Sequence, residues 1–226
     1  MSERVAVVVG AGGDLGLATA LLLADAGFTV TAVDRTEKAL DAVPDGIRRE
    51  EGDATDPTVA RNVIDRIATE SGPPEVLVNT LGVFRPGEAL AATPEDLRLM
   101  MDVNLGAALW LSQAVAPYMR GRGGGAIVHV SARPASEPTL GVAAYSLSKA
   151  ALNHLVRVLD LELRPHGIRV NAVAPQLLDT AKNRAMLPPE ALAHAVPPET
   201  IANVIAFLVG DLATNISGAI VPAHGV

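Results

Sequence analysis

Val5–Gly27, VAVVVGAGGDLGLATALLLADAG, places an apolar run before a glycine-rich turn and a segment of helical period. The apolar run does not alternate with polar residues, which is typical of a strand covered on both faces. The glycines fall at Gly10, Gly13 and Gly16, so the common pattern G-x-G-x-x-G, which needs its last glycine at Leu15, is not met. The stretch therefore predicts a central strand, a tight turn and a helix, in that order.

The composition of the 226 residues limits the class of protein. With 49% hydrophobic and 19% charged residues the chain can bury one core, so we expect a single domain over residues 1–226. A net charge of −7 argues against nucleic acid or an anionic membrane surface as a partner. The absence of cysteine excludes disulfides and thiolate metal sites, and the five histidines show no close paired spacing, so no metal site is expected.

The apolar runs indicate a cytoplasmic protein. The first run is too short and too soon interrupted by glycine for a signal peptide. Residues such as Asp25 and Asp34 interrupt the other runs before they reach the length of a membrane span. We therefore expect no membrane partner.

Short β-branched runs alternate with segments of helical period along the chain, which predicts a doubly wound α/β fold with a parallel sheet. The expected strands lie within 4–10, 28–34, 47–53, 74–80, 125–131, 167–175 and 217–223. The expected helices lie near 15–26, 56–71, 94–119, 144–165 and 198–209. Segment 176–197 has little periodicity and two Pro-Pro pairs in it or at its border, so we expect a loop or short-helix excursion that covers a substrate.

The glycine turn suits a pyrophosphate. Such a turn needs one glycine to leave the strand, one to let the backbone approach the ligand and one for close helix packing, and Gly10, Gly13 and Gly16 supply these. The first helical amides, near Asp14 and Leu15, offer hydrogen bonds and the positive end of the helix dipole. Asp14 is expected to cap the helix, although its carboxylate adds negative charge near the phosphates. A tight turn without a ligand is the alternative.

Asp34 ends the second expected strand about 20 residues after the turn, where a carboxylate accepts hydrogen bonds from an adenosine ribose. This carboxylate would repel a 2′-phosphate, so NAD(H) is the preferred cofactor. Arg35 offsets part of that repulsion, which leaves NADP(H) possible. Asp53, followed by Ala54 in the turn GDATD, is a candidate acceptor for the adenine amino group or an ordinary turn aspartate.

Tyr145 and Lys149 are one helical turn apart in AAYSLSKAAL and share a helix face. A free tyrosine has a pKa near 10, but a neighbouring ammonium favours the phenolate and lowers that pKa. Tyr145 would then serve as an acid in reduction or a base in oxidation. A Tyr-x-x-x-Lys pair alone is often surface packing, and its place downstream of a nucleotide turn strengthens the catalytic interpretation.

Together these residues resemble the short-chain dehydrogenase/reductase family over nearly the whole chain. The matching motifs are the glycine turn, Asp34, GDATD, VLVNTLG at 76–82, DVNL with Asn104, AAYSLSKAAL, GIRVNAVAP ending at Pro175, and Thr180. The resemblance implies a single-domain Rossmann fold of seven parallel strands. It also implies a homo-oligomer, dimer or tetramer, built through the helices near 94–119 and 144–165.

The resemblance also implies roles for individual residues in an NAD(P)(H)-dependent oxidoreductase that acts on a small molecule. Tyr145 would be the acid/base, Lys149 would bind the nicotinamide ribose and lower the tyrosine pKa, and Asn104 would order a water in the proton relay. Thr180 would hold the carboxamide. The remaining cofactor-lining positions would be Asn79, Leu81, Gly82 and Pro175, although NTLG departs from the family's Asn-Asn-Ala-Gly at two positions.

One expected family residue is absent. The family has a serine thirteen residues before the tyrosine, and this position is Ala132. Ser131 should face away from the site because successive strand side chains alternate, unless a bulge brings Ser131 or Ser136 in. This absence, the spacing of the glycines and Gln176 in place of glycine resemble the dihydropteridine reductase branch, which works without the serine.

That branch reduces a quinonoid C=N system, so an imine-like, quinonoid or enone substrate, or an activated carbonyl, is expected here. The substrate candidates are Ser131, Ala132, Gln176, Leu177 and His194. A non-redox enzyme of the same fold, such as an isomerase, dehydratase or cyclase, is the alternative, and a cofactor-binding subunit without catalysis is a third. Of the other residues, His129 is expected to pack at a strand face and Trp110 at a helix or subunit contact.

Overall fold

Seven parallel strands form one sheet in the computed structural model, which describes residues 4–225. The strands are β1 (Val5–Val9), β2 (Thr29–Asp34), β3 (Arg48–Glu51), β4 (Val76–Asn79), β5 (Gly125–Val130), β6 (Ile168–Pro175) and β7 (Ile220–Ala223). Each lies within one of the expected ranges, and their order in the sheet is β3-β2-β1-β4-β5-β6-β7. The predicted doubly wound, seven-stranded parallel sheet of a single-domain Rossmann fold is confirmed.

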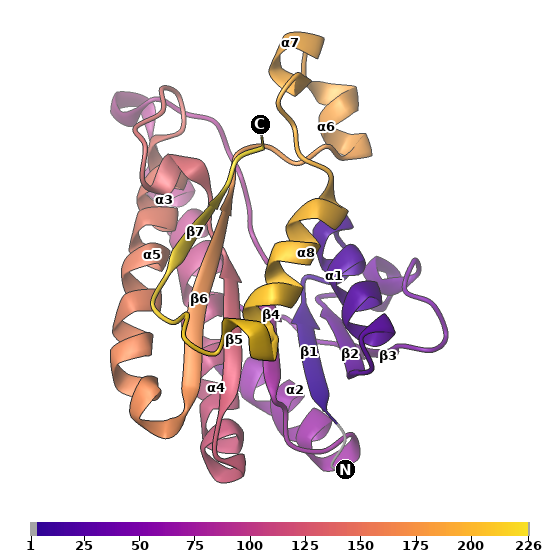
Figure 1. The fold of residues 1–226 in the computed structure, drawn as a ribbon. Coiled ribbons are helices and arrows are strands. Elements are labelled where there is room, and N and C mark those ends of the chain that lie inside the picture. The colour runs from indigo at the N-terminus through magenta and orange to yellow at the C-terminus, as the bar shows by residue number, and fades with distance from the viewer. Residues whose placement is uncertain (1–3, 226) are drawn as a thin grey trace.

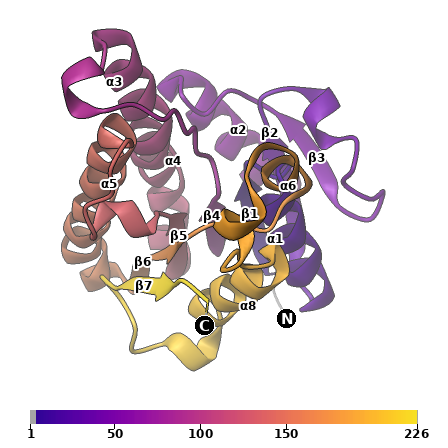
Figure 2. The ribbon, with the colours of Figure 1, turned by 90° about the horizontal axis from the view of Figure 1, so that it is seen from above.

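Helices cover both faces of the sheet (Figure 1, Figure 2). They are α1 (Asp14–Asp25), α2 (Pro57–Glu70), α3 (Pro94–Met101), α4 (Ala107–Arg122), α5 (Ala143–Leu163) and α8 (Pro198–Val209). In β1, Val5, Val7 and Val9 pack under α2, α4 and α5, while Ala6 and Val8 pack under α1 and α8. Both sets are buried, which explains why this strand is apolar without alternation.

The sequence predicted one continuous helix over 94–119, and the structure divides this region. A π-helical turn, Asp102–Gly106, separates α3 from α4, and α4 continues to Arg122. Gly123, with a φ of 87°, then ends the helix in the left-handed conformation that glycine tolerates best. π turns are frequent at functional sites, and this one contains Asn104.

Helix Pro94–Arg122 is long and apolar enough to cross a membrane by length and composition alone. The sequence analysis expected no apolar run of that length, because charged residues interrupt each run. Half of its most apolar window is buried inside the domain, and α4 packs against α2 and the sheet. Those contacts support its interpretation as a core helix.

The carboxyl ends of all seven strands meet at one edge, where the loops between β1 and α1 and between β4 and α3 begin. The chain order reverses between β1 and β4, and the crevice at such a point is the usual ligand site of this architecture. Segment 176–197 rises from the same edge as α6 (Ala181–Met186) and α7 (Pro189–Leu192) (Figure 1). The predicted short-helix excursion is therefore present, at the edge where a substrate would enter.

Candidate active site

Three glycines of the turn, Gly10, Gly12 and Gly16, admit no side chain. Gly10 has a φ of 82°, and a Cβ there would lie 2.7 Å from Oγ1 of Thr80. A Cβ on Gly16 would lie 2.2 Å from the carbonyl oxygen of Gly10, so α1 and the end of β1 are in backbone contact. Thr80 ties the two central strands together by donating to the carbonyl of Val9 at 2.8 Å.

The expected capping role of Asp14 is wrong. Helix α1 begins one residue earlier than predicted, so Gly13 is the N-cap and Asp14 is the first helical residue. A carboxylate in the first turn still interacts favourably with the helix dipole. The amides of Asp14, Leu15 and Gly16, in the first turn of α1, lie among those that make no bond inside a helix.

Most of the predicted adenosine-side residues share one hollow at the ends of β1 and β2, with a volume of about 290 Å³. It is lined by Val9, Asp34, Arg35, Gly52, Asp53, Ala54, Thr55, Leu81, Gly82, Val83, Leu99 and Val103. Asp34 spans its rim, where Oδ2 accepts from the amide of Gly12 at 2.9 Å and Oδ1 accepts from the amide of Arg35 at 2.7 Å. The structure thus brings together residues from five separate segments of the sequence.

Asp53 shapes its own turn. Its Oδ1 accepts from the amide of Thr55 at 3.0 Å and from the hydroxyl of Thr55 at 2.6 Å. The hydroxyl bond lowers the pKa of Asp53 below its usual value, more than burial raises it. The carboxylate is therefore charged at neutral pH on the wall of the hollow.

Tyr145 and Lys149 both lie near the start of α5. The Lys149 ammonium is buried and donates to the carbonyl of Val130, at the end of β5, at 2.7 Å. The Tyr145 ring packs edge-to-face against Phe84, with 5.0 Å between ring centroids. Phe84 lies in the chain that follows β4 and is 57% exposed.

The predicted direction of the Tyr145 pKa shift is wrong for this structure. Burial raises the pKa of Tyr145 to about 12, and burial lowers the pKa of Lys149 to about 8. The Lys149 ammonium donates its hydrogen bond to the Val130 carbonyl. Burial is the dominant cause of the shift in the Tyr145 pKa. At neutral pH the tyrosine therefore holds its proton.

Asn104 fixes the chain that follows β4. Its Oδ1 accepts from the amide of Val83 at 2.9 Å, and its Nδ2 donates to the carbonyl of Val83 at 3.1 Å and to Oγ of Ser148 at 2.9 Å. Ser148 in turn donates to the carbonyl of Tyr145 at 2.8 Å. Asn104 thus links the strand end to the catalytic helix, and its predicted role in ordering a water stays a prediction.

Gly82 leaves open the space where these groups converge. A Cβ at this position would lie 3.4 Å from both Asn104 Oδ1 and Lys149 Nζ. The gap lies beside the hollow that contains Asp34 and Asp53. A ligand that extends from that hollow past Gly82 would reach the lysine.

Ala132 stands where a catalytic hydroxyl was expected. Its backbone is extended and its side chain is buried. Ser131 donates to Oδ1 of Asn153 at 2.6 Å, and Nδ2 of Asn153 donates to Oγ of Ser136 at 3.3 Å. Both candidate serine hydroxyls are thus bonded to Asn153, one helical turn beyond Lys149 on α5.

The predicted substrate residues of the excursion lie in or just below it. Gln176 Oε1 accepts from Arg133 at 2.8 Å, which joins the loop after β6 to the loop after β5. Leu177 and Leu178 begin the excursion, which is closed at its base by backbone bonds to Val196. His194 lies near its end, and nothing in the contacts of His194 tests a substrate role.

Two residues predicted to contact the cofactor lie at the same edge. Pro175 is the last residue of β6, and Thr180 starts α6 by accepting from the amide of Asn183 at 3.1 Å. This cap positions the Thr180 side chain at the base of the excursion, and its predicted hold on a carboxamide stays a prediction. The sequence analysis missed Phe84 and Arg133. Phe84 lies two residues after Gly82 and Arg133 lies one residue after Ala132, so their nearness to these predicted positions was the available signal.

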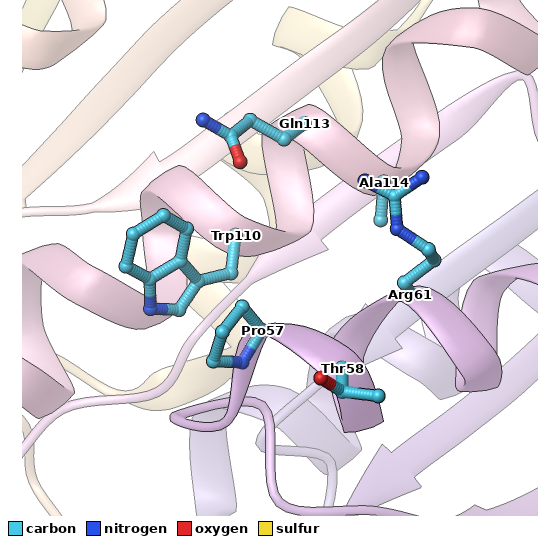
Figure 3. A pocket seen from close by; sticks show the side chains of 6 residues that line it. All are labelled: Pro57, Thr58, Arg61, Trp110, Gln113 and Ala114. Atoms are coloured by element: carbon cyan, nitrogen blue, oxygen red, sulfur yellow. The ribbon is translucent and has the colours of Figure 1, made fainter.

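A second hollow, of about 220 Å³, lies between α2 and α4 (Figure 3). It is lined by Pro57, Thr58, Arg61, Trp110, Gln113 and Ala114. Trp110 and Pro57 are neighbours in this view, one from α4 and one from α2 (Figure 3). The predicted packing role of Trp110 agrees with this position between two helices. The predicted cofactor residues Asp34 and Asp53 line the first hollow and not this one.

His129 is buried in β5, as predicted, behind the residues that line the site. Burial lowers the pKa of His129 to about 3, and the charge of Lys149 acts in the same direction. His129 is therefore neutral over the whole physiological range.

Among residues 4–225, no three histidine, cysteine, aspartate or glutamate side chains are grouped so as to hold a metal ion.

We expect His129 to make folding sensitive to mild acid. Because its folded pKa is below the unfolded value of 6.5, its contribution is complete above pH 6.5 and is lost as the pH falls toward about 3. Between pH 6.5 and 5 the free energy of unfolding should fall by about 1.4 kcal/mol per pH unit from this group. Urea unfolding of wild type and His129→Asn at several pH values measures it, and an equal slope in both proteins would contradict the prediction.

A family model of the short chain dehydrogenases matches residues 4–191. The chain belongs to the short-chain dehydrogenase family. It is 39% identical over 185 residues to the short-chain reductase protein NovJ of Streptomyces niveus, which covers 79% of this chain and 70% of that protein. It is 33% identical over 228 residues to 2,3-dihydro-2,3-dihydroxybenzoate dehydrogenase of Escherichia coli (strain K12), which covers 93% of this chain and 91% of that protein.

Solved structures of short-chain dehydrogenases share the fold. The structure of 7α-hydroxysteroid dehydrogenase complexed with NADH and 7-oxo glycochenodeoxycholic acid superposes with a TM-score of 0.92 at 30% identity. The match covers 98% of this chain and 93% of that one. This short-chain dehydrogenase is accordingly an NAD(P)-dependent oxidoreductase.

The residues of this short-chain dehydrogenase fit a nicotinamide dinucleotide. The hollow at Asp34 and Asp53, the gap beside Gly82 and the free amides of α1 form one continuous edge from the glycine turn to Lys149. The amides suit a pyrophosphate, and the carboxylate of Asp34 suits ribose hydroxyls. The chemistry of these groups agrees with the cofactor that the family uses.

Proposed function

We propose that the enzyme reduces a conjugated small molecule, with an imine-like, quinonoid or enone group or an activated carbonyl, and uses NADH as hydride donor. The observation that carries this proposal is Ala132, a buried methyl group where the family has a hydroxyl. Ser131 donates its one hydroxyl hydrogen to Asn153, so it supplies no substitute in this arrangement, and Ser136 Oγ is held by a bond from the same Asn153. A conjugated acceptor spreads the incoming charge and depends less on a fixed donor than a simple ketone does.

The same features support a place in the dihydropteridine reductase-like branch. Its members work with tyrosine and lysine and without the serine. The glycines of the turn are spaced three residues apart, and Gln176 follows β6. Both features depart from the commoner family pattern, and both resemble this branch. We propose this branch on these residues alone.

A bound NADH would supply the hydride, and Tyr145 would supply the proton. The phenol Oη–H bond breaks and its proton passes to the substrate nitrogen or oxygen that takes the electron pair. With its pKa raised to about 12, Tyr145 is protonated at neutral pH, which is the form that a reduction needs. Lys149, held against Val130, lies near Gly82, where its ammonium would bind the ribose hydroxyls.

A substrate panel tests the proposed acceptor class. We expect NADH oxidation with quinones and cyclic imines and little with simple ketones. Ala132→Ser should raise kcat/KM for simple ketones, because an oxyanion donor is worth about 10²–10³-fold where it is well placed. Efficient turnover of simple ketones by the wild type, with no turnover of conjugated acceptors, would overturn the proposal.

We also propose a preference for NADH over NADPH, supported by Asp34. Hydrogen bonds to a charged group contribute about 1.5–3 kcal/mol, so Asp34→Ala should lower kcat/KM for NADH by about tenfold to a hundredfold. Asp34→Asn is the matched variant, because it keeps an acceptor for the Gly12 amide while it removes the charge and the acceptor that faces the Arg35 amide. It should improve NADPH relative to NADH, and an unchanged ratio would show that the carboxylate does not select the cofactor.

Assembly as a homodimer or homotetramer through α4 and α5 is proposed as well. Leu147 and Leu161 on α5 are exposed apolar side chains, which a second copy would cover. A cytoplasmic location stays a prediction from the sequence.

A further inference from the structure

A buried chain of polar side chains crosses from α4 through β5 to β4, behind the cofactor hollow. Ser112 lies 3.1 Å from Nε2 of His129, and Nδ1 of His129 lies 3.4 Å from Nδ2 of Asn79. Oδ1 of Asn79 accepts from the amide of Leu81 at 3.1 Å. All three side chains are at most 2% exposed, so water does not replace a missing partner.

The hydrogens of this chain can be assigned one by one. Ser112 has a single hydroxyl hydrogen, and it is donated to the carbonyl of Ala108 at 2.7 Å. Oγ of Ser112 is therefore an acceptor toward His129, and Nε2 of His129 carries the ring hydrogen. A neutral imidazole then has a lone pair on Nδ1, which accepts from Nδ2 of Asn79. The side-chain oxygen of Asn79 therefore faces the backbone N–H of Leu81.

We propose that His129 is a positioning residue for the cofactor. It fixes the orientation of the Asn79 amide, which in turn holds the backbone at Leu81, where the chain lines the hollow with Gly82. This inference rests on the proposed cofactor site and goes beyond it, because His129 lies beneath that site and lines neither hollow.

Loss of the imidazole acceptor removes the constraint on Asn79. The amide would then be free to rotate and to direct Nδ2 at the Leu81 amide, where two donors oppose each other. The segment from Asn79 to Gly82 would no longer be held in one shape. Binding of the cofactor would then include the free energy of ordering that segment.

Two amide substitutions separate the two ends of the imidazole. The side-chain oxygen of asparagine ends as many bonds from Cα as Nδ1 of histidine does, and the terminal atoms of glutamine end as many as Nε2. His129→Asn therefore keeps an acceptor for Asn79 and loses Ser112, whereas His129→Gln reaches Ser112 and loses Asn79. His129→Leu loses both contacts.

We expect NADH affinity to follow the contact with Asn79. A typical hydrogen bond corresponds to about a threefold to tenfold change, so the Kd for NADH should rise by that factor in His129→Gln and His129→Leu. It should stay close to the wild-type value in His129→Asn, although this variant also loses stability. Titration of the purified full chain with NADH, followed by tyrosine or tryptophan fluorescence, gives the Kd, and thermal unfolding gives Tm. Ile67→Val, a core substitution on α2, is the control that lowers Tm without changing the Kd.

The outcomes distinguish the inference from the proposed function. If wild type binds neither NADH nor NADPH, the proposed function itself fails. If wild type binds NADH, the relation between affinity and stability decides. A Kd for NADH that rises as Tm falls, across the three His129 variants and Ile67→Val alike, would mean that His129 only supports the core, and the inference would be overturned. The ring nitrogen shifts of His129 in ¹⁵N NMR give a direct check, because a hydrogen on Nδ1 in place of Nε2 would also overturn it.

Discussion

Tyr145→Phe is expected to lower kcat by about a hundredfold to ten-thousandfold, the usual range for loss of a general acid. Phenylalanine keeps the ring and its edge-to-face contact with Phe84, and it removes only the hydroxyl that donates the proton. The effect should therefore fall on kcat, with the Kd for NADH little changed. Steady-state NADH oxidation with the best acceptor of the panel, together with NADH titration, measures both quantities.

A matched variant separates loss of the proton from disturbance of the site. Phe84→Leu alters the packing of the same ring and leaves the Tyr145 hydroxyl in place, so its kcat should fall much less than that of Tyr145→Phe. Retention of kcat within about tenfold in Tyr145→Phe would mean that the proton comes from another group, because a general acid contributes more than that.

Gly16→Ala is expected to destabilise the fold by about 3 kcal/mol or more, at the upper end of the cost of overpacking. The added methyl group would lie 2.2 Å from the carbonyl oxygen of Gly10 and 2.7 Å from Cα of Ala11. Both are backbone atoms of the turn, so α1 has to move away from β1. Urea unfolding gives the free energy, and NADH binding should weaken with it because the helix amides are displaced.

Gly13→Ala is the matched control for this prediction. A Cβ there would meet only the carbonyl oxygen of Gly10, at an ordinary 3.5 Å, and the backbone φ is −86°. Its free energy of unfolding should change by less than about 1 kcal/mol. If Gly13→Ala weakens NADH binding at unchanged stability, the backbone at this position approaches the ligand. Equal destabilisation by both variants would show that close helix packing is not what Gly16 provides.

The fold could be predicted from the sequence because its signals are local. The apolar run, the glycine turn and the helical period of Val5–Gly27 lie within one stretch, and each expected strand was found inside its range. The same holds for Tyr145 and Lys149, whose spacing on one helix is fixed by the helical period alone.

The remaining parts of the site depend on contacts between distant segments. The π turn at Asn104 is not visible in the pattern of apolar residues, and Asn104 reaches Ser148, 44 residues away in sequence. The sign of the Tyr145 pKa shift is set by burial, to which Phe84 contributes from another loop. Asp14 was misassigned because helix starts are accurate only to within a residue or two.

The base of segment 176–197 has an evolutionary consequence. Val196 donates to the carbonyl of Leu177 at 2.8 Å and accepts from the amide of Asp179 at 2.9 Å, so the two ends of the segment are already fastened side by side. Residues between these ends can be lengthened, shortened or exchanged with only a slowly growing cost in chain entropy. Selection for new substrates can thus act on an interchangeable cover while the catalytic chemistry beneath it is inherited intact.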